Sequence, residues 1–368
     1  MPTLNKRIAI LGSGFGAIVT APALRAEGWE IVALFSRREE QAKKIADELR
    51  IPHRTTDYQA LVQRDDIDAV VVSTPTSTHH EIVLAALQAG KHVLAEKPLA
   101  MTTAEAQDML DAAAASDRTC MVNFEFRHTV HALQISRLIE EGKIGRPQSA
   151  IATLYLARNL PAVGPGWRSR LDMGGGALYQ QASHYFDALR GWLGEITSVY
   201  AHVAVHEPLR IDPETGERSQ SDADDFLSAT LTFESGAAAT LAMIWSARSP
   251  SVGNLHITGP GGTIAHQGYI GLFSPGPVTH TPPIDLEAGP DAPFGEESAP
   301  LPPPADIEPL PEVAIIAASR RLLRDFERGI VEGTSPSPNF FDGLRTQLVL
   351  DAARESARTG RVVDVPPS

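Results

Sequence analysis

Short apolar runs alternate with amphipathic stretches along the first 125 residues of the chain. The apolar runs are RIAILG, EIVALF, DAVVVST, KHVLAE and CMVNF. Each has the length and composition of a strand that is buried on both faces. The stretches between them, such as residues 38–50 and 102–117, have the spacing of amphipathic helices, and Thr102 and Thr103 are suitable N-caps for the second one. This alternation predicts a parallel α/β sheet.

The pattern changes after Gly145, where apolar and polar positions alternate over longer runs. These runs are PQSAIATLYLAR, ITSVYAHVAVHE, DFLSATLTFESG and AAATLAMIWSA. A period of two predicts antiparallel strands with one covered face. Helical periodicity returns at 313–333 and 340–360, before the short run RVVDV. We therefore predict an α/β domain over residues 1–125 and an α+β domain over 126–368, built on a large, mostly antiparallel open sheet.

Two segments carry no regular pattern. Residues 275–311 hold twelve of the 28 prolines, which predicts an irregular surface excursion. The acidic segment SDADDF at 221–226 predicts a solvated turn into a strand, since no histidine or cysteine stands around it at metal-ligand spacing. We expect no metal site.

Length, charge and cysteine content narrow the class of protein. The 368 residues exceed the size of a single core, which agrees with two domains. A formal net charge of −13 opposes nucleic-acid binding, and no apolar run approaches the roughly 20 residues of a membrane span. The single cysteine, Cys120, excludes an intrachain disulfide, and we expect it to be a small buried hydrophobe. The first residues lack the apolar region of a secretory signal, so we predict a cytoplasmic protein that binds neither membrane nor nucleic acid.

A glycine-rich segment follows the first predicted strand. Gly12, Gly14 and Ala17 have G-x-G-x-x-G/A spacing, Phe15 lies between them, and the segment opens a helix. Glycines at these positions permit a tight turn and a close approach of the backbone to a pyrophosphate, which the helix N-terminus attracts. Its position in the first strand-helix unit predicts a Rossmann dinucleotide-binding domain.

The end of the second predicted strand bears on the choice between NAD and NADP. Sites that prefer NAD place a carboxylate there for the ribose 2′-hydroxyl, whereas this chain has Ser36, Arg37 and Arg38. A hydroxyl and two guanidinium groups suit a 2′-phosphate, so we predict NADP, with NAD as the second choice. The alternative is that both arginines only decorate the start of a helix, where cations are mildly unfavourable.

Four segments between residues 12 and 194 carry a resemblance that is in register over almost the whole chain. They are GSGFGA, STPTSTHHEIVLAALQAGKHVLAEKPLA, GKIGRP and GGGALYQQASHYFDALRGWLG. Together they resemble the Gfo/Idh/MocA family of oxidoreductases. The resemblance implies an N-terminal Rossmann domain, a C-terminal α/β domain with a large open sheet, and hydride transfer between NAD(P) and a hydroxyl or carbonyl carbon, usually of a sugar or polyol. It also implies a small-molecule substrate and a homodimer or homotetramer assembled through the C-terminal sheet.

The resemblance assigns Lys97, in the E-K-P segment, a catalytic or substrate-orienting role beside the nicotinamide. A lysine that is partly desolvated there can donate a hydrogen bond to a substrate oxygen as charge develops on it. Glu96, Thr74 and Pro75 join the glycine-rich segment as residues expected to bind the cofactor. His79 either contacts the cofactor as well or only begins the next helix.

The same resemblance places His184 on the family's catalytic histidine and Asp187 on the acid that follows it. Positions 180, 184 and 187 share one face of a helix. The family's usual aspartate is replaced here by Gln180. Because a glutamine cannot exchange protons, His184 becomes the predicted general acid or base, while the Gln180 amide can still hold a substrate hydroxyl.

Four further residues carry less specific signals. Arg127 and Arg168 match positions where family members often have an arginine near the cleft, although surface or interdomain pairing explains either one. Tyr155 and Tyr179 either line the substrate pocket or pack in the core.

Two alternatives to a sugar or polyol dehydrogenase stay open. Relatives with the same fold act on cyclic dihydrodiols, hydroxy-semialdehydes and tetrapyrroles, and Gln180 in place of aspartate gives that alternative weight. A non-catalytic NADP-binding regulator, similar to the yeast galactose-pathway co-repressor, would keep the fold without turnover. Intact Lys97 and His184 argue against the regulator.

Overall fold

The computed structural model describes residues 5–157, 166–212, 215–268, 274–283 and 300–367, and the chain divides into two compact units. The first unit contains Met1–His128, Asp172–Gly174 and Pro311–Leu348. The second unit contains Thr129–Leu171, Gly175–Leu310 and Val349–Ser368. The predicted boundary after residue 125 lies close to the break at His128, whereas the prediction assigned Pro311–Leu348 to the second domain.

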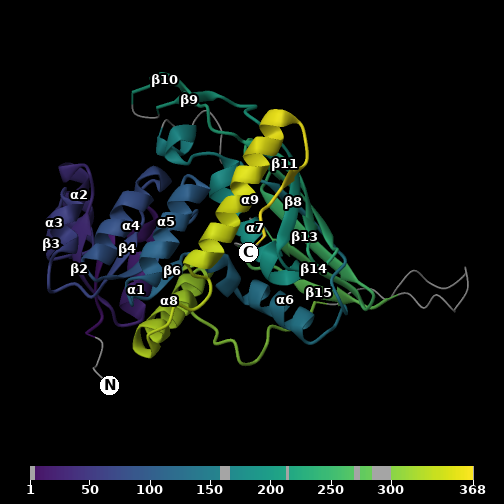
Figure 1. The fold of residues 1–368 in the computed structure, drawn as a ribbon, viewed down its shortest axis with the longest axis horizontal. Helices are drawn as coiled ribbons and strands as arrows, with labels where there is room; N and C mark the ends of the chain where they lie inside the picture. The colour runs from purple at the N-terminus through teal and green to yellow at the C-terminus, as the bar shows by residue number, and fades with distance from the viewer. Residues whose placement is uncertain (1–4, 158–165, 213–214, 269–273, 284–299, 368) are drawn as a thin grey trace, which may run out of the picture. The chain divides into compact units, whose positions relative to one another are not determined.

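A six-stranded parallel sheet forms the centre of the first unit, in the order β3-β2-β1-β4-β5-β6 (Figure 1). Its strands are β1 (Arg7–Leu11), β2 (Glu30–Phe35), β3 (His53–Thr55), β4 (Ala69–Val72), β5 (His92–Ala95) and β6 (Cys120–Val122). The five apolar runs predicted these strands except β3, which is short and mostly exposed and therefore has no hydrophobic signal. The strand order reverses between β1 and β4, and Rossmann folds bind dinucleotides at that point, beyond the carboxyl ends of the strands.

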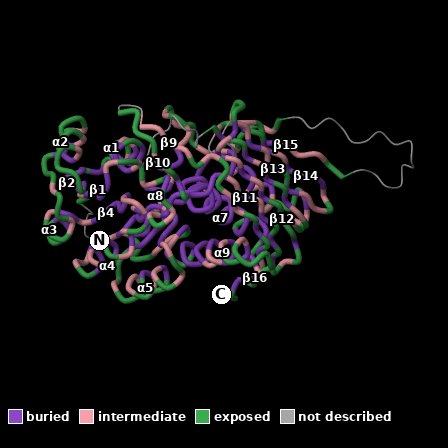
Figure 2. The backbone as a smooth tube through the Cα atoms, turned by 90° about the horizontal axis from the view of Figure 1, so that it is seen from above, coloured by how far each residue is buried: buried purple, intermediate pink, exposed green. Residues whose placement is uncertain are grey.

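Helices cover both faces of this sheet. They are α1 (Ala21–Ala26), α2 (Glu39–Glu48), α3 (Tyr58–Val62), α4 (His79–Gln88) and α5 (Thr103–Ala114). Side chains of α1 and α2 join one buried cluster, and those of α3, α4 and α5 join another. The outer sides of α2 and α5 are exposed (Figure 2). Thr102 is the N-cap of α5, as predicted, because its hydroxyl accepts a hydrogen bond from Glu105 N at 3.2 Å.

Helix α8 (Ala314–Glu332) explains why a late segment belongs to the first unit. Its residues Leu322, Leu323 and Phe326 are buried in the cluster that also contains side chains of α1. The Phe326 ring stacks on Trp29 with 6.1 Å between ring centroids. The periodicity of 313–333 predicted the helix correctly, but it carried no information about which sheet the apolar face would cover.

An eight-stranded sheet dominates the second unit, in the order β15-β14-β13-β7-β12-β11-β8-β16 (Figure 1). Its strands are β7 (Ser149–Tyr155), β8 (Ile196–Ala204), β11 (Phe226–Phe233), β12 (Ala238–Ile244), β13 (Val252–Gly259), β14 (Gly262–Gly268), β15 (Val278–Thr281) and β16 (Val363–Asp364). Neighbouring strands are antiparallel except β7 and β12, which pair in parallel. Buried and exposed residues alternate along β7 and β11. The predicted open, mostly antiparallel sheet with one covered face is therefore confirmed.

The remaining elements connect and cover the sheet of the second unit. They are α6 (Val130–Glu140), α7 (Ser183–Leu193), the hairpin β9 (Leu209–Ile211) and β10 (Arg218–Gln220), and α9 (Phe340–Thr359), which begins in the first unit and ends in the second. Short helical turns are η1 (Gly16–Thr20), η2 (Thr76–Thr78), η3 (Glu125–His128), η5 (Trp167–Ser169), η6 (Leu171–Met173) and η7 (Leu178–Ala182), of which η1 and η7 are π-helical. Helix α7 is buried along most of its length (Figure 2).

The structure also tests two predictions about single segments. Strand β15 lies inside 275–311, so the prediction of a wholly irregular excursion was wrong there, while residues 284–299 lie outside the described residues. Cys120 is buried, as predicted, and burial raises the pKa of its thiol to about 12.

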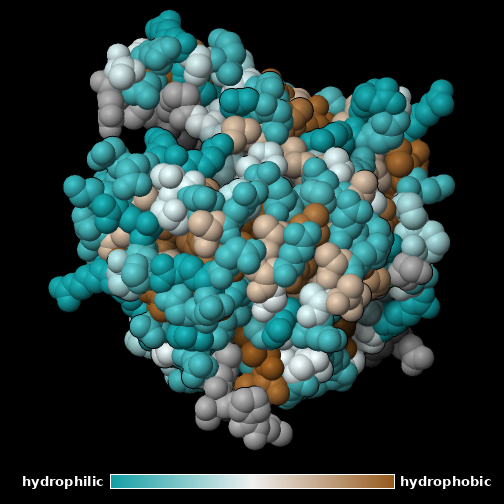
Figure 3. Space-filling model, turned by 60° about the vertical axis from the view of Figure 1, so that its left-hand side comes forward, coloured by the Kyte–Doolittle hydropathy of each residue, from teal (hydrophilic) through white to brown (hydrophobic). Residues whose placement is uncertain are grey.

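Within the described part of the chain, no helix is both long enough and apolar enough to span a membrane. The face drawn in Figure 3 is mostly hydrophilic, and its hydrophobic groups are small and scattered.

Candidate functional site

The glycine-rich segment lies directly after β1, at the edge of the sheet where the strand order reverses. Gly12 has φ +131°, and a Cβ there would stand 2.1 Å from the carbonyl oxygen of Ser73, the residue after β4. Only glycine fits at this position. Around Gly14, by contrast, nothing lies within 4 Å of a hypothetical Cβ, so its backbone is open to a ligand.

The helix that follows is held to the end of β4. Gly16 N donates a hydrogen bond to Ser73 Oγ at 2.8 Å, at the first residue of η1. Sequence reasoning missed Ser73, whose only signal was its position directly after a strand. Ala17 is buried and Phe15 is half-buried at the start of the turn. A turn with an open backbone at Gly14, a fixed helix start and no bulky side chain at Gly12 fits a dinucleotide pyrophosphate.

The residues expected at the ribose lie at the end of β2. Ser36 is buried, and its hydroxyl oxygen lies 3.3 Å from that of Ser13 in the glycine-rich segment. Arg37 and Arg38 are exposed, and the Arg38 side chain does not cap α2. Two exposed guanidinium groups therefore stand at the strand end where a ribose 2′ substituent would lie.

His79 is a buried link between two loops of this edge. Its ring nitrogens lie 3.0 Å from the Thr74 carbonyl oxygen on one side and 3.1 Å from that of Pro98 on the other. Burial lowers the pKa of His79, which favours the neutral ring. His79 also begins α4, so it holds the loop after β4, with Thr74 and Pro75, against the loop that carries Lys97.

The E-K-P segment follows β5 at the same edge of the sheet. Glu96 is buried, and its Oε1 accepts a hydrogen bond from Asn123 Nδ2 at 2.6 Å. Its Oε2 lies 3.3 Å from the backbone nitrogen of Lys97, which donates to it. Lys97 is half-buried, and the peptide bond between it and Pro98 is cis. Glu96 thus braces the strand end from which Lys97 projects.

Glu125 adds a carboxyl group to this cluster that sequence reasoning missed. It lies three residues beyond β6, the neighbour of β5, and is completely buried. Burial raises the pKa of Glu125 to about 8, helped by the charge of Glu96 and opposed by that of Lys97. The signal in the sequence was a glutamate in NFEFRH, close behind a strand parallel to the one that ends in Glu96.

Asp224 holds the start of the helical segment that contains His184. Its Oδ2 accepts a hydrogen bond from Leu178 N at 2.8 Å, and its carbonyl oxygen accepts one from Ala177 N at 2.9 Å. A Cβ at Gly176 would lie 2.2 Å from Asp224 Oδ1, so the glycine permits this close approach. Burial raises the pKa of Asp224 to about 6.

The prediction of a solvated acidic turn at 221–226 was therefore wrong. Asp225 is also buried, and its carboxylate oxygens accept hydrogen bonds from His206 N at 2.8 Å and Glu207 N at 2.7 Å. Backbone amides replace water around both carboxylates. The strand that the prediction placed after this turn is present as β11.

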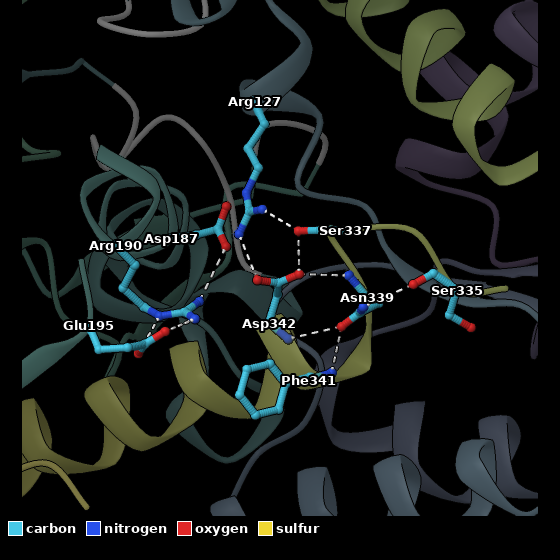
Figure 4. A network of polar contacts seen from close by, with 9 residues as sticks. All are labelled: Arg127, Asp187, Arg190, Glu195, Ser335, Ser337, Asn339, Phe341 and Asp342. Atoms are coloured by element: carbon cyan, nitrogen blue, oxygen red, sulfur yellow. Dashed lines mark hydrogen bonds and ion pairs between the residues drawn. The ribbon is translucent and has the colours of Figure 1, made fainter. Parts of the chain in front are cut away.

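Gln180, His184 and Asp187 lie on the continuous segment formed by η7 and α7, and all three are buried. Gln180 lies in the π-helical turn, a feature that is common at functional sites. Asp187 Oδ1 is 3.9 Å from Arg190, whose Nε donates to Glu195 at 3.0 Å (Figure 4). Asp187 thus has a cationic neighbour on its own helix.

The four residues with less specific signals have different surroundings in the structure. The Arg127 guanidinium donates to Ser337 Oγ at 2.7 Å and to Asp342 Oδ1 at 3.1 Å, all within the first unit (Figure 4). Arg168 is exposed and stacks over its neighbour Trp167, at 4.7 Å from the ring centroid. The remaining pair consists of two tyrosines that differ in burial. Tyr155 is 41% exposed on β7, which excludes core packing, whereas Tyr179 is completely buried beneath the Arg354 guanidinium.

Comparison with known proteins agrees with this arrangement. The family model described as "Oxidoreductase family, NAD-binding Rossmann fold" matches residues 6–124, and the model described as "GFO/IDH/MocA C-terminal domain" matches residues 132–265. The chain is 29% identical to levoglucosan dehydrogenase of Pseudarthrobacter phenanthrenivorans, over 98% of each protein. It is 32% identical to 4-carboxy-2-hydroxymuconate-6-semialdehyde dehydrogenase of a Sphingobium species, over 66% of this chain and 73% of that protein.

A solved structure is similar over the full length of the chain. Levoglucosan dehydrogenase in complex with NADH and L-sorbose has a TM-score of 0.87 and 26% identity, with 100% of both chains covered. The chain therefore belongs to the Gfo/Idh/MocA family of NAD(P)-dependent oxidoreductases. The predictions of the family, of the fold class and of a dehydrogenase or reductase are confirmed.

Proposed function

We propose that the protein transfers a hydride between NADP and a hydroxyl or carbonyl carbon of a sugar or polyol. The observation that carries the proposal is the open glycine turn after β1, at the edge of the sheet where the strand order reverses between β1 and β4. Lys97 follows β5, the strand beside β4, at the same edge. The relatives support a sugar, since one is named for levoglucosan and was crystallised with L-sorbose.

The cofactor is assigned to residues of the first unit. Gly12, Gly14, Phe15 and Ala17 hold the pyrophosphate, and Ser36, Arg37 and Arg38 hold the 2′-phosphate. Thr74, Pro75, His79 and Glu96 line or brace the nicotinamide side. When bound, NADP takes up a hydride from a CH–OH carbon or delivers one to a carbonyl carbon. NAD is the second choice, because the similar structure contains NADH.

The proton chemistry is assigned to Lys97 and His184. In the oxidation direction, the substrate hydroxyl loses its proton to the His184 imidazole while the carbon loses its hydride. The Lys97 ammonium donates a hydrogen bond to the same oxygen and stabilises the negative charge that develops there. In the reduction direction, His184 returns the proton to the oxygen. Gln180 holds a second substrate hydroxyl through its amide.

The other predicted substrate residues receive supporting roles in this proposal. Asp187 and Arg190 form a charged pair one turn from His184, which suits an orienting role. Tyr179 is assigned a structural role because it is buried, and Arg127 is assigned one because it is paired with Asp342. Arg168, an exposed cation stacked on Trp167, is assigned to the substrate, and Tyr155 is reassigned to the outer face of the sheet.

A non-sugar substrate is the second candidate. Gln180 in place of the family's aspartate favours it, and a semialdehyde dehydrogenase is among the relatives. A non-catalytic regulator is less favoured, because Lys97 and His184 are both present. We also predict a cytoplasmic location and a homodimer or homotetramer assembled through the sheet of the second unit.

A substrate panel followed by Lys97→Ala tests the proposal. Sugars, polyols, dihydrodiols and semialdehydes are first assayed with NADP and NADPH. On the best substrate, Lys97→Ala is expected to raise the activation free energy by about 2 to 4 kcal/mol, as when one preorganised donor is removed, and so to lose turnover. Its cofactor affinity should stay the same. The exposed Lys44→Ala is the control and should keep full activity.

Two outcomes would count against the proposal. Unchanged turnover in Lys97→Ala excludes the role of the lysine. For the histidine, His184→Ala should lose one ionisation from the pH-rate profile, and its persistence would assign proton transfer to another group. A purified protein that binds NADP but turns over nothing in the panel would favour the regulator instead.

A further inference from the structure

Two residues with carboxyl groups follow neighbouring strands at one edge of the sheet of the first unit. Ala95, at the end of β5, pairs in parallel with Val122, at the end of β6. Glu96 follows Ala95 directly, and Glu125 follows Val122 after two residues. The carboxyl ends of parallel strands lie at the same edge of the sheet, so Glu96, Lys97 and Glu125 are neighbours because of the fold.

The two carboxyl groups differ in what surrounds them. Glu96 accepts hydrogen bonds from Asn123 Nδ2 at 2.6 Å and from Lys97 N at 3.3 Å, and such bonds favour its charged form. Glu125 is completely buried. Burial and the charge of Glu96 both raise its pKa, while the charge of Lys97 and a backbone hydrogen bond lower it. At neutral pH, Glu125 is therefore the carboxyl group of the pair that keeps its proton.

Other ionisable groups near Glu125 are paired elsewhere. On η3 itself, Arg127 donates to Asp342, and His128 Nε2 lies 2.9 Å from Asp325 of α8. Asp342 therefore balances the charge of Arg127, and Asp325 is a hydrogen-bond partner of the His128 ring. Two other groups lie on elements beside this edge of the sheet. On α8, Arg321 donates to the His128 carbonyl oxygen at 3.1 Å, and His79 at the start of α4 is buried with a lowered pKa.

We propose that Glu125 is a positioning residue for Lys97: its buried carboxyl, on the loop after β6, lies beside the loop after β5 that carries Lys97, and its ionised form holds the Lys97 ammonium in the charged state. The proposal deepens the function proposed above, because it assigns the control of the charge that Lys97 offers to the substrate oxygen. Glu125 acts through Lys97 and does not need to touch the substrate.

The physical reason is reciprocity. The interaction by which the charge of Lys97 favours ionised Glu125 must equally favour charged Lys97 when Glu125 is ionised. When Glu125 ionises, a negative charge appears near Lys97 that is absent while Glu125 is neutral. The lysine therefore keeps its proton to a higher pH than it would without Glu125.

Competitive labelling with acetic anhydride tests this on the full chain without a substrate. The amine of Lys97 is labelled between pH 6 and pH 11, and the extent is measured by peptide mass spectrometry, with exposed Lys44 as the internal reference. In Glu125→Gln, the pH of half-labelling at Lys97 is expected to fall by roughly one unit, the effect of removing a nearby opposite charge. The midpoint at Lys44 should not move.

Two variants separate charge from structure. Glu125→Asp keeps the carboxyl on a shorter side chain and should give a Lys97 midpoint between those of the wild type and Glu125→Gln. Glu48→Gln removes an exposed carboxylate from α2 and should leave the midpoint at the wild-type value. Equal midpoints in the wild type and Glu125→Gln, both shown to be folded by circular dichroism, would overturn the proposal.

The result is independent of the activity assays. If Lys97→Ala keeps full turnover, the proposed role of Lys97 in the reaction fails, whatever the labelling shows. If Lys97→Ala is inactive but the labelling midpoint does not move in Glu125→Gln, only the role of Glu125 fails. When a substrate is in hand, the alkaline limb of the pH-rate profile of Glu125→Gln should shift to lower pH together with the labelling.

Discussion

Arg37 and Arg38 are two exposed cations at a strand end in a chain whose net charge is −13. A local positive pair is needed to attract a phosphate against that background. Charge-assisted hydrogen bonds of about 1.5 to 3 kcal/mol each would give NADPH an affinity about tenfold or more above that of NADH, even if one arginine engages. Fluorescence titration of the cofactor-stripped protein measures both dissociation constants.

Substitutions at the same strand end test the cofactor preference further. Ser36→Asp combined with Arg37→Ala should reverse the preference, because a carboxylate accepts from the ribose 2′-hydroxyl and repels a phosphate. Arg50→Ala, which removes an exposed cation beyond α2, should leave the ratio unchanged. Equal dissociation constants in the wild type would mean that the two arginines only decorate the start of α2.

Glu125 is expected to cost the protein stability as pH rises. Its pKa is about 8 in the folded chain against an ordinary value of 4.5, so between these values the native state binds one more proton than the unfolded chain. Unfolding stability must then fall as pH rises through that window. Glu125→Gln has no such ionisation. Its stability advantage over the wild type should grow between about pH 4.5 and pH 8, by on the order of a few kcal/mol.

Urea unfolding of the first unit at a series of pH values measures this difference. Glu48→Gln again serves as the control, since its carboxylate is exposed. A constant difference between wild type and Glu125→Gln across the whole window would show that the buried carboxyl does not titrate there.

At the scale of an element, the start of the η7–α7 segment depends on one side chain that is distant in the sequence and lies just before β11. Asp224 accepts from Leu178 N at 2.8 Å, and Ala at this position would leave that amide buried without its acceptor. Asp224→Ala should destabilise the second unit by about 1 to 3 kcal/mol. Asp224→Asn keeps an acceptor oxygen and should cost less.

Amide hydrogen exchange at Leu178 measures the local effect of Asp224→Ala, and urea unfolding measures the global one. Glu234→Ala, which removes an exposed carboxylate from the same unit, should change stability by less than about 0.5 kcal/mol. Unaltered exchange at Leu178 in Asp224→Ala would mean that the helix start is held by other contacts.

The same element shows what the sequence can and cannot predict. Gly176, Gln180 and His184 belong to one recognisable segment, so their neighbourhood was predictable from local spacing. Asp224 and Glu125 were not, because a carboxylate in an acidic or polar segment is solvated in most proteins. Their burial results from pairing across the fold: Asp224 meets backbone amides distant in sequence, and Glu125 lies beside the end of a neighbouring strand.

At the scale of the whole molecule, periodicity identified elements better than it identified their partners. The predicted strands of both sheets were largely confirmed, since each carries its own alternation or apolar run. The hairpin of β13 and β14 was missed, because its alternation is interrupted by glycines and polar residues. The return of α8 to the first unit was also missed. An apolar face on a helix shows that the helix packs against other apolar residues, but it does not show which sheet carries them.

Among the described residues, the exposed face of the second unit's sheet bears on the predicted association of copies of the chain. The strand register places Ile151, Thr240, Thr230 and Tyr200 in one row across β7, β12, β11 and β8. These residues point away from the buried face, and Ile151 is 56% and Tyr200 48% exposed. A row of apolar and small neutral side chains suits contact with a second copy better than contact with water.

Charge introduced into this row is therefore expected to break the predicted assembly. Ile151→Asp combined with Tyr200→Asp should sediment as a monomer at concentrations where the wild type is a dimer or tetramer, because a carboxylate on each copy would be desolvated at the interface. Val331→Asp is the matched control: it places the same charge on a valine that is 52% exposed on α8, and it should keep the wild-type mass. Sedimentation velocity over a hundredfold range of concentration distinguishes these outcomes. A wild type that is monomeric throughout, or a double variant that keeps the oligomeric mass, would show that copies of the chain do not meet at this face.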